Sequence, residues 1–462
     1  MEFFEELNAQ RTQYIKQQVI LNDKESCQNI PNDGKNREFS KNKMQTIFNG
    51  TRTEFYNYDF MTWLACSIQG TFTLSKSVDN DIYVNVDRLA DIRRVREYIT
   101  RLQKIGEASV SGDVFNTELP LVIKVAQFGK DRVNLELFHE FFVGMQLNKL
   151  RSNFFNSDGN FGGAGVPGKP GTSAVPNFMF VYGLFRCEMV RGADHFCRSF
   201  SDPANYLLIE KITGPSILEL FLAYMNDGRD QLVLSMIVQI ICALHIAYTR
   251  TNFCHYDLHL GNILVRNLTE IIYSRPNVIP RKNDFVYIPY FAEKMNFYVK
   301  AKVLPTIIDY GRAHVNDQYG NSYGNYMTEN PDVEPLNARP ICDLYKFVGF
   351  VALVASRLGN VKWIHLMRFF EFQQYDEDDA PYIDELNDNE LKQFIDEELP
   401  ERFSIGDRMR DFETPERKKT TYLSFLAFLK RDYKEEWNVV VQEGAKPNDA
   451  PELSCFDLNC NF

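Results

Sequence analysis

The pattern of apolar and polar positions predicts several strands in the first part of the chain. LPLVIKVA, which starts at residue 119, is typical of a buried strand, whereas NLELFHEFFVGMQLNKLR from residue 134 predicts a helix. NFMFVYGLF from residue 177 and NYLLIEKI from residue 205 predict two further strands. Before them, apolar residues recur at helical spacing over 86–104 and predict an amphipathic helix. The first part is therefore expected to be rich in strands, with one helix embedded among them.

The pattern becomes mostly helical from residue 216 onward, except at 255–265 and at 303–311. The changeover between the two patterns falls near Thr213 and Gly214. Strands followed by helices in this order predict an α+β fold, in which a strand-rich part with one helix precedes a mainly helical part. The small sheet of the first part is expected to be antiparallel if the chain has the fold of the family that its motifs resemble, as described below.

The longest apolar stretch, LVLSMIVQIICALHIAY at 232–248, is interrupted by Ser235, Gln239 and His245. It is short for a membrane span, so a helix buried inside the protein is expected and no span. The N-terminus lacks a basic region followed by an apolar run, as a signal peptide would have. Nine cysteines without a CxxC pair indicate reduced thiols. We therefore expect a cytoplasmic protein.

Charge narrows the classes of partner. The formal net charge is -11, which argues against a general nucleic-acid binder because phosphate backbones are bound by clustered Lys and Arg. Much of the acidity lies in 371–401, where a solvated helical surface or loop is the expectation. The segment 22–45 is polar and predicts a loose linker, and 156–176 is crowded with Gly and Pro and predicts a flexible excursion. No nucleic acid is expected as a partner.

The motif HYDLHLGNILV, which starts at residue 255, places polar side chains directly before an apolar run. Transfer of a phosphoryl group from a nucleotide needs a carboxylate that orients the attacking hydroxyl, oxygen ligands for Mg²⁺ and a cation on the phosphates. Asp257 and Asn262 are five positions apart, the separation between the base and the metal-binding amide in a kinase catalytic loop. In TIIDYG, Asp309 follows an apolar pair and precedes Tyr310 and Gly311, which fits a second Mg²⁺ ligand.

A lysine inside an apolar strand supplies the cation. Lys124 lies within LPLVIKVA, and a buried ammonium needs an anionic partner. The next helix offers Glu136 and Glu140. Glu140 has apolar neighbours at helical spacing and therefore lies on the inward-facing stripe, so we expect it to pair with Lys124.

Over roughly 100 to 360, these motifs in this order resemble a eukaryotic-type protein kinase. CDLYKFVGFVALVA adds Asp343, which matches the buried aspartate that holds the catalytic loop in that family. PNFMFVYG, IIDYGRAHV and DLYKF further resemble the divergent serine/threonine kinases of large nucleocytoplasmic DNA viruses, of the iridovirus, ascovirus and marseillevirus kind. The resemblance implies a two-lobed fold, ATP and Mg²⁺ as cofactors, and a protein substrate with a Ser or Thr hydroxyl.

The resemblance also implies roles for single residues. Asp257 would be the catalytic base, Lys124 held by Glu140 would bind the phosphates, and Asn262 and Asp309 would hold Mg²⁺. The nucleotide would contact a loop of the glycine-rich type and backbone near the hinge. The residues expected around it are Ile105, Gly106, Ala108, Ser109, Gly112, Val114, Lys124, Glu210 and Ile212.

The sequence departs from the family pattern at three places. Ala108 stands where the middle glycine of the phosphate loop is expected. Tyr256 replaces the arginine that pairs with an activation-loop phosphate, which predicts activity without such a phosphate. His259 replaces the lysine that touches the transferred phosphate, and the resulting DLHxGN form also resembles small-molecule kinases of the aminoglycoside and choline type.

Other interpretations of the motif stay open at the level of sequence. His255, Asp257 and His259 alternate and could ligate a metal ion in a metallohydrolase. The motif could also be a buried polar turn without chemistry, or belong to a kinase-fold scaffold without activity. The metallohydrolase interpretation leaves Lys124, Asn262 and the DYG triplet unexplained.

The chain of 462 residues is longer than one core usually organises, and 44% hydrophobic residues can bury a substantial core. Compared with the family, the distance from Asn262 to Asp309 is long and implies an insertion, as a substrate-docking element or a structural flap. The expected divisions are an N-terminal extension at 1–85, partly flexible at 22–45, a first lobe at 86–213 with an insertion at 156–176, a second lobe at 214–440 with an insertion at 266–302, and a tail at 441–462.

Overall fold

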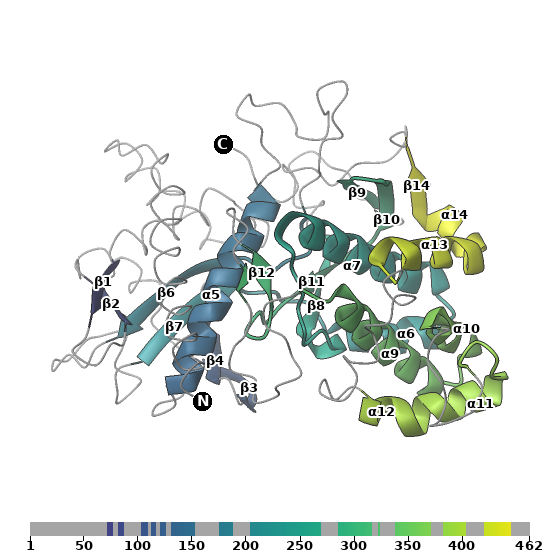
Figure 1. The fold of residues 1–462 in the computed structure, drawn as a ribbon, viewed down its shortest axis with the longest axis horizontal. Coiled ribbons are helices and arrows are strands. Elements are labelled where there is room, and N and C mark those ends of the chain that lie inside the picture. The colour runs from purple at the N-terminus through teal and green to yellow at the C-terminus, as the bar shows by residue number, and fades with distance from the viewer. Residues whose placement is uncertain are drawn as a thin grey trace.

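A computed structural model shows a mixed α+β protein with small antiparallel sheets (Figure 1), as the sequence predicted. It describes residues 72–76, 82–86, 103–109, 112–116, 121–125, 131–152, 175–187, 204–268, 285–316, 322–323, 338–370, 382–402 and 420–444. The expected linker at 22–45, residues 87–102 of the helix expected at 86–104, nearly all of the excursion at 156–176 and the acidic residues 371–381 lie outside the described residues. Both ends of that expected helix are wrong, because Val86 ends the strand Ile82–Val86 and Gln103 begins the strand Gln103–Ser109.

Five strands form the largest sheet, all antiparallel, in the order β3-β4-β5-β7-β6. The strands predicted near 119, 177 and 205 correspond to three of them, and the other two form a hairpin. The bounds are β3 Gln103–Ser109, β4 Gly112–Asn116, β5 Leu121–Val125, β6 Val181–Cys187 and β7 Ala204–Glu210. A separate hairpin, β1 Phe72–Lys76 with β2 Ile82–Val86, ends one residue beyond the expected N-terminal extension at 1–85.

The helix α5, Asp131–Ser152, packs on this sheet through buried residues such as Leu137 and Leu147 (Figure 1). The side-chain amide of Asn148 bonds both backbone groups of Val181: Asn148 Nδ2 donates to Val181 O at 2.6 Å, and Val181 N donates to Asn148 Oδ1 at 3.1 Å. Gly144 lets the helix approach this closely, because a Cβ there would lie 2.1 Å from a methyl of Val181. These contacts set the position of α5 on the sheet.

The long helix α7, Asp230–Thr251, is buried from Val233 to Ala247 and packs against α6, α13 and α14. The polar interruptions noted in its sequence bind neighbouring backbone: Ser235 Oγ donates to Lys300 O at 2.7 Å and Gln239 Nε2 to Val303 O at 3.1 Å. Although α7 is long and apolar enough to cross a membrane, it is a core helix here, as expected. The other helices are α6 Ile217–Asn226, α9 Pro340–Arg357, α10 Val361–Ile364, α11 Asp388–Gln393, α12 Leu399–Arg402, α13 Tyr422–Asp432 and α14 Lys434–Val440.

The mostly helical pattern expected after residue 216 is wrong for one segment. β9 Val286–Ala292 and β10 Met295–Ala301 form a hairpin, and β14 Val441–Glu443 from the expected tail adds a third strand. Tyr290 and Val299 of the hairpin are fully buried against the core that includes α7. The described part of the insertion at 266–302 is therefore a structural layer, because its apolar face is covered by the protein itself.

The strands β8 and β11 pair to form a two-stranded ribbon, which lies between the large sheet and the helices (Figure 1). β8, Ile263–Asn267, is the apolar run after the catalytic-loop motif, and β11, Val303–Ile307, precedes Asp309. Their antiparallel pairing opposes Ile263 to Ile307. Both motifs singled out in the sequence are thereby brought to the same end of one ribbon. A further short pair, β12 Val315–Asn316 with β13 Ser322–Tyr323, follows.

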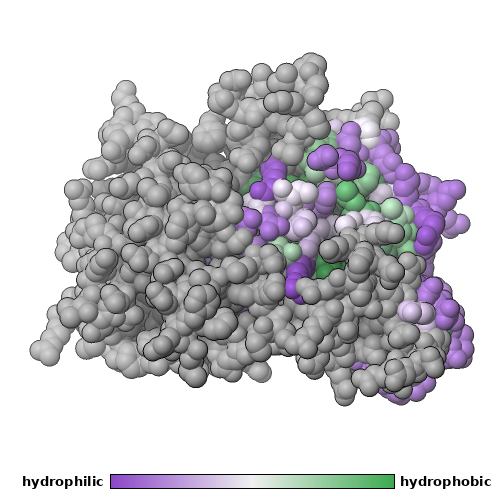
Figure 2. Space-filling model, in the orientation of Figure 1, coloured by the Kyte–Doolittle hydropathy of each residue, from purple (hydrophilic) through white to green (hydrophobic). Residues whose placement is uncertain are grey.

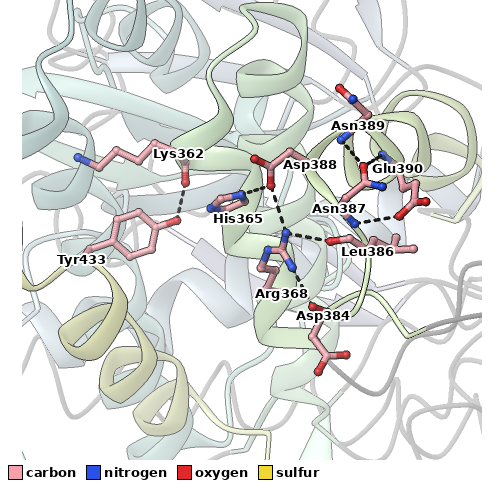
Figure 3. Close-up of polar contacts among 10 residues, drawn as sticks. All are labelled: Lys362, His365, Arg368, Asp384, Leu386, Asn387, Asp388, Asn389, Glu390 and Tyr433. Atoms are coloured by element: carbon pink, nitrogen blue, oxygen red, sulfur yellow. Dashed lines mark hydrogen bonds and ion pairs between the residues drawn. The ribbon is translucent and has the colours of Figure 1, made fainter.

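A polar network joins the end of α10 to α11 (Figure 3). Asp388 accepts from His365 Nε2 at 2.7 Å and from Arg368 Nη2 at 3.2 Å. Asn387 caps α11 in a reciprocal capping box with Glu390. Figure 2 shows that the described surface over α11, α13 and α14 is mainly hydrophilic. The described part of the acidic segment is thus a solvated helical surface, as expected.

Candidate active site

Lys124 lies on β5 in the middle of the large sheet, opposite Val114 on one side and Leu207 on the other. Its buried Nζ donates to Glu140 Oε2 at 2.7 Å and to Asp309 Oδ1 at 3.0 Å. Burial would lower the pKa of the amine, but the charges of Asp309 and Glu140 raise it above its ordinary value. Lys124 is therefore a cation, and the ion pair with Glu140 expected from the sequence is present.

Glu140 reaches Lys124 because α5 is bonded both to the large sheet and to the segment that follows Asp309. Its side chain is buried, on the inward stripe that the sequence predicted. The neighbouring His139 lies with Nε2 2.6 Å from Ala313 O, in the segment that follows Asp309. Burial lowers the pKa of His139 to about 4, so the ring is neutral and donates this hydrogen bond at physiological pH. The helix is thus tied to the segment that carries Asp309.

Asp309 follows β11 in the left-handed region, with φ of 63°. Ile308 N, just before it, donates to Asn262 O at 2.9 Å, which holds this residue beside the catalytic-loop motif. Burial raises the pKa of Asp309, but the charge of Lys124 outweighs this and the pKa lies below its ordinary range. The side chain is therefore a carboxylate.

Tyr310 explains why the triplet can carry tyrosine at its centre. The ring is fully buried, and its hydroxyl lies 2.9 Å from Ile307 O and 3.1 Å from Met179 O. A buried hydroxyl needs such a partner. The aromatic ring also meets the His255 ring edge-on, with centroids 6.3 Å apart. Tyr310 thus links β11, the segment before β6 and the loop that begins at His255.

Asp343, in the first turn of α9, binds the backbone at the start of the motif HYDLHLGNILV. Asp343 Oδ2 accepts from His255 N at 2.6 Å and Oδ1 from Tyr256 N at 2.7 Å. Tyr256 adopts φ of 59°, a region that a bulky residue rarely occupies. Two charge-assisted hydrogen bonds therefore stabilise a strained turn at the point where the chain presents Asp257.

We expect Asp343→Ala to lower the free energy of unfolding by about 3 kcal/mol, because two buried N–H groups lose their acceptor. Urea denaturation of the purified chain measures this. Asp384→Ala, which removes an exposed carboxylate, is the matched control and should change the free energy by less than about 0.5 kcal/mol. Equal, small effects of the two substitutions would contradict the role assigned to Asp343.

Asp257 follows this turn and is partly buried. Its Oδ1 lies 2.6 Å from Lys346 Nζ, which reaches it from α9. Burial raises the pKa of Asp257, but the charge and hydrogen bond of Lys346 lower it below its ordinary value. The carboxylate is therefore ionised at neutral pH and could accept a proton from a hydroxyl.

Asn262 ends the short 3-10 turn Leu260–Asn262, and its Nδ2 donates to Asp257 O at 2.9 Å. The donor end of the amide is thus engaged within the loop, and the acceptor Oδ1 is the end suited to a cation. An amide oxygen here and the Asp309 carboxylate are hard oxygen donors, which Mg²⁺ takes together with phosphate oxygens. This donor set fits Mg²⁺ bound with a nucleotide.

The histidines do not form a metal site of the hydrolase kind. His255 Nδ1 accepts from Asp257 N at 3.2 Å and Nε2 lies 2.9 Å from Ile308 O, so both ring nitrogens are engaged. His259 Nδ1 accepts from Gly261 N at 3.1 Å. Among the residues that the structure describes, no three His, Cys, Asp or Glu side chains are grouped so as to hold a metal ion. The arrangement argues against the metallohydrolase interpretation.

The residues expected around a nucleotide fall on the four strands β3, β4, β5 and β7 and on the segment after β7. Val114, opposite Lys124, and Ile212, after β7, are partly buried apolar residues packed against the core. Glu210 N donates to Phe180 O at 2.9 Å, so this amide is engaged within the protein. The contacts of these residues with a nucleotide stay a prediction. β3 carries Ile105, Gly106, Ala108 and Ser109, and β4 carries Gly112 and Val114, with Ser109 opposite Gly112.

Sequence reasoning missed a buried ion pair at the end of β7. Glu210 accepts from Arg266 through both carboxylate oxygens at 2.7 Å, and Glu210 Oε2 also accepts from Phe180 N at 3.0 Å. Arg266 Nε donates to Thr306 Oγ1 at 3.1 Å. The pair joins the large sheet to the β8–β11 ribbon. The only signal in the sequence was that Glu210 and Arg266 are charged residues near the ends of two strands. That signal does not show that they pair with each other.

Lys346 was missed as well. It lies three residues after Asp343, on the same side of α9, and that spacing is the signal that could have identified it.

Comparison with known proteins finds distant relatives, and no family model matches the chain. It is 35% identical over 206 residues to "Uncharacterized protein 038R" of Invertebrate iridescent virus 3, covering 42% of this chain and 31% of that protein. "Probable kinase 098L" of the same virus is 26% identical over 174 residues, 37% of this chain and 30% of the relative. Serine/threonine-protein kinase haspin of Mus musculus is 27% identical over 201 residues, 38% of this chain and 25% of the relative.

The chain therefore spans less than a third of the length of each of these curated relatives. This distant similarity confirms the resemblance to viral kinases that the motifs indicated. The chain is a distant homologue of two iridovirus proteins, one of them named a probable kinase, and of a mammalian serine/threonine-protein kinase.

Proposed function

We propose that the chain is an ATP- and Mg²⁺-dependent serine/threonine protein kinase. The observation that carries the proposal is that Glu140 and Asp309, from two distant segments, both lie within 3.0 Å of the Lys124 ammonium. Asp257 lies on the loop that is bonded to the residue before Asp309 through Asn262. Similarity to a probable viral kinase and to haspin supports the same reaction class.

In this proposal the sheet with α5 is the first lobe and the helices from α6 onward are the second. ATP would bind between them, with its adenine edge against the backbone near Glu210 and Ile212. The strand and hairpin residues from Ile105 to Val114 would cover the phosphates. The division into lobes at residue 214 and a cytoplasmic location belong to the same proposal.

The residues would divide the chemistry as follows. Lys124, held by Glu140, would bind the α- and β-phosphates, and Asp257 would orient the acceptor hydroxyl and accept its proton. Asn262 and Asp309 would hold Mg²⁺, which neutralises charge on the phosphates when it is bound. His259 would border the acceptor site, since its ring packs on Phe350 of α9, with centroids 6.2 Å apart.

The test is transfer of labelled γ-phosphate by the purified full chain. With Mg²⁺ and labelled ATP, we expect label on Ser or Thr of casein, and removal of Mg²⁺ by EDTA should abolish it. Choline and kanamycin are offered in parallel, because the DLHxGN form leaves a small-molecule kinase as the second candidate. Label on those molecules alone would establish that candidate instead.

A scaffold without activity gives a third pattern. Such a protein would label nothing, and Mg²⁺ with ATP would leave its melting temperature unchanged. Binding of ATP would raise the melting temperature by mass action, so the two measurements together separate the three functions.

A further inference from the structure

The carboxylate proposed as the catalytic base is held by a lysine from a different element. Lys346 Nζ lies 2.6 Å from Asp257 Oδ1, with side-chain exposures of 14% and 26%. The contact is short and charge-assisted, and it is shielded from water more than a surface pair. It therefore restricts the rotation of the Asp257 carboxylate.

The backbone that carries Lys346 is rigid. α9 is anchored by buried residues such as Phe347, Val348 and Val351. One turn before Lys346, Asp343 holds the backbone N–H groups of the two residues that precede Asp257. One face of α9 thus binds both the turn and the carboxylate that the turn presents.

The loop itself brings no cation to Asp257. Between Asp257 and Asn262 its sequence is LHLG, without Lys or Arg. His259 uses Nδ1 to accept from Gly261 N and packs its ring on Phe350.

We infer that Lys346 is a positioning residue for phosphoryl transfer: it fixes one oxygen of Asp257 so that the other faces the acceptor hydroxyl. This inference rests on the function proposed above. Through it, α9 supplies the positive charge that the loop lacks, next to the point where the hydroxyl loses its proton. A misplaced base loses much of its effect even when the substrate is still bound.

The test compares Lys346→Met and Lys346→Arg in the full chain, with casein and Mg²⁺-ATP. We expect Lys346→Met to lower kcat by about 100-fold while the KM for ATP changes by less than about twofold. Lys346→Arg keeps the charge and should recover kcat to within about tenfold of the unsubstituted chain. A kcat for Lys346→Met within about threefold of the unsubstituted chain would overturn the inference.

Lys362→Met is the matched control. Lys362 is also ion-paired, to Asp230 at 2.8 Å and to Glu436, but on α10 and with partners other than Asp257. It should lower the melting temperature and leave kcat within about twofold. Should Lys346→Met and Lys362→Met lower kcat equally, the effect of Lys346 would be one of stability alone.

A double substitution tests whether Lys346 acts through Asp257. If it does, Asp257→Asn with Lys346→Met is no slower than Asp257→Asn alone. An additional loss of about 100-fold in the double variant would show that Lys346 acts elsewhere, which overturns the inference.

Failure of the inference differs from failure of the proposed function. Carbon-13 NMR of labelled aspartate carboxyls, assigned with Asp257→Asn, follows the contact without any transfer reaction. We expect Lys346→Met to raise the pKa of Asp257, because its neighbouring cation is gone. An unsubstituted chain that transfers no phosphate refutes the proposed function and the inference together. An active chain in which neither kcat nor this pKa responds to Lys346→Met refutes the inference alone.

Discussion

Asp257→Asn is expected to lower the rate of phosphate transfer by about 1,000-fold, because an amide cannot accept the proton of the acceptor hydroxyl. The fold should persist, since the backbone at this turn is held by Asp343 and by Asn262. ATP binding should persist too, because Lys124 and its partners lie on other segments. Single-turnover transfer to casein, with the melting temperature as a check on folding, measures the effect.

The chain provides a closely matched control for that substitution. Asp230 has the same side-chain exposure of 26% and is likewise paired with a lysine, Lys362, but lies at the start of α7. Asp230→Asn should lower the melting temperature, since it also weakens the bond to Trp363 Nε1. Its transfer rate should stay within about twofold. Equal rates for Asp257→Asn and the unsubstituted chain would refute the assigned base.

Arg266→Met is expected to lower the free energy of unfolding by about 3 to 5 kcal/mol, because it leaves a buried carboxylate unpaired. The side chains of Arg266 and Glu210 are 1% and 2% exposed, so water cannot replace the lost partner. The bidentate pair also fixes the end of β7 against β8, where the proposed hinge begins. Urea denaturation of the full chain is the measurement.

Two further variants isolate the cause of this loss. Combining Arg266→Met with Glu210→Gln removes both charges and should recover at least about 2 kcal/mol, since the unpaired buried charge is gone. Arg431→Met removes an exposed arginine that pairs with Asp432, with side-chain exposures of 73% and 37%, and should change the free energy by less than about 1 kcal/mol. A loss of that small size for Arg266→Met would contradict the assigned role of the pair.

Patterns that are local in the sequence predicted the elements that carry the site. The strand around Lys124, the helix with Glu140 and the strands beside the loop at 255 follow from spacing and apolar runs, because burial imposes these periods directly. The choice of Glu140 over Glu136 came from the same rule, since residues at helical spacing share one face.

The β9–β10 hairpin was not predicted, although VYIPYFA and MNFYVKA flank a short turn. Its apolar residues are buried by α7 and by the third strand, β14, which comes from near the C-terminus. The two strands of the hairpin are neighbours in the sequence, but pairing of β10 with a segment as distant as β14 leaves no local pattern.

The residue pattern alone identified candidates for the proposed phosphoryl transfer, because the reaction needs an acid, oxygen ligands for Mg²⁺ and a cation, and because the spacing of these residues resembles that of protein kinases. Which charges meet followed from the packing of the elements: Lys346 with Asp257, and Arg266 with Glu210. A charged side chain specifies the sign of its partner and nothing about that partner's position in the chain. The partner is selected when packing brings two elements together and water is excluded from between them.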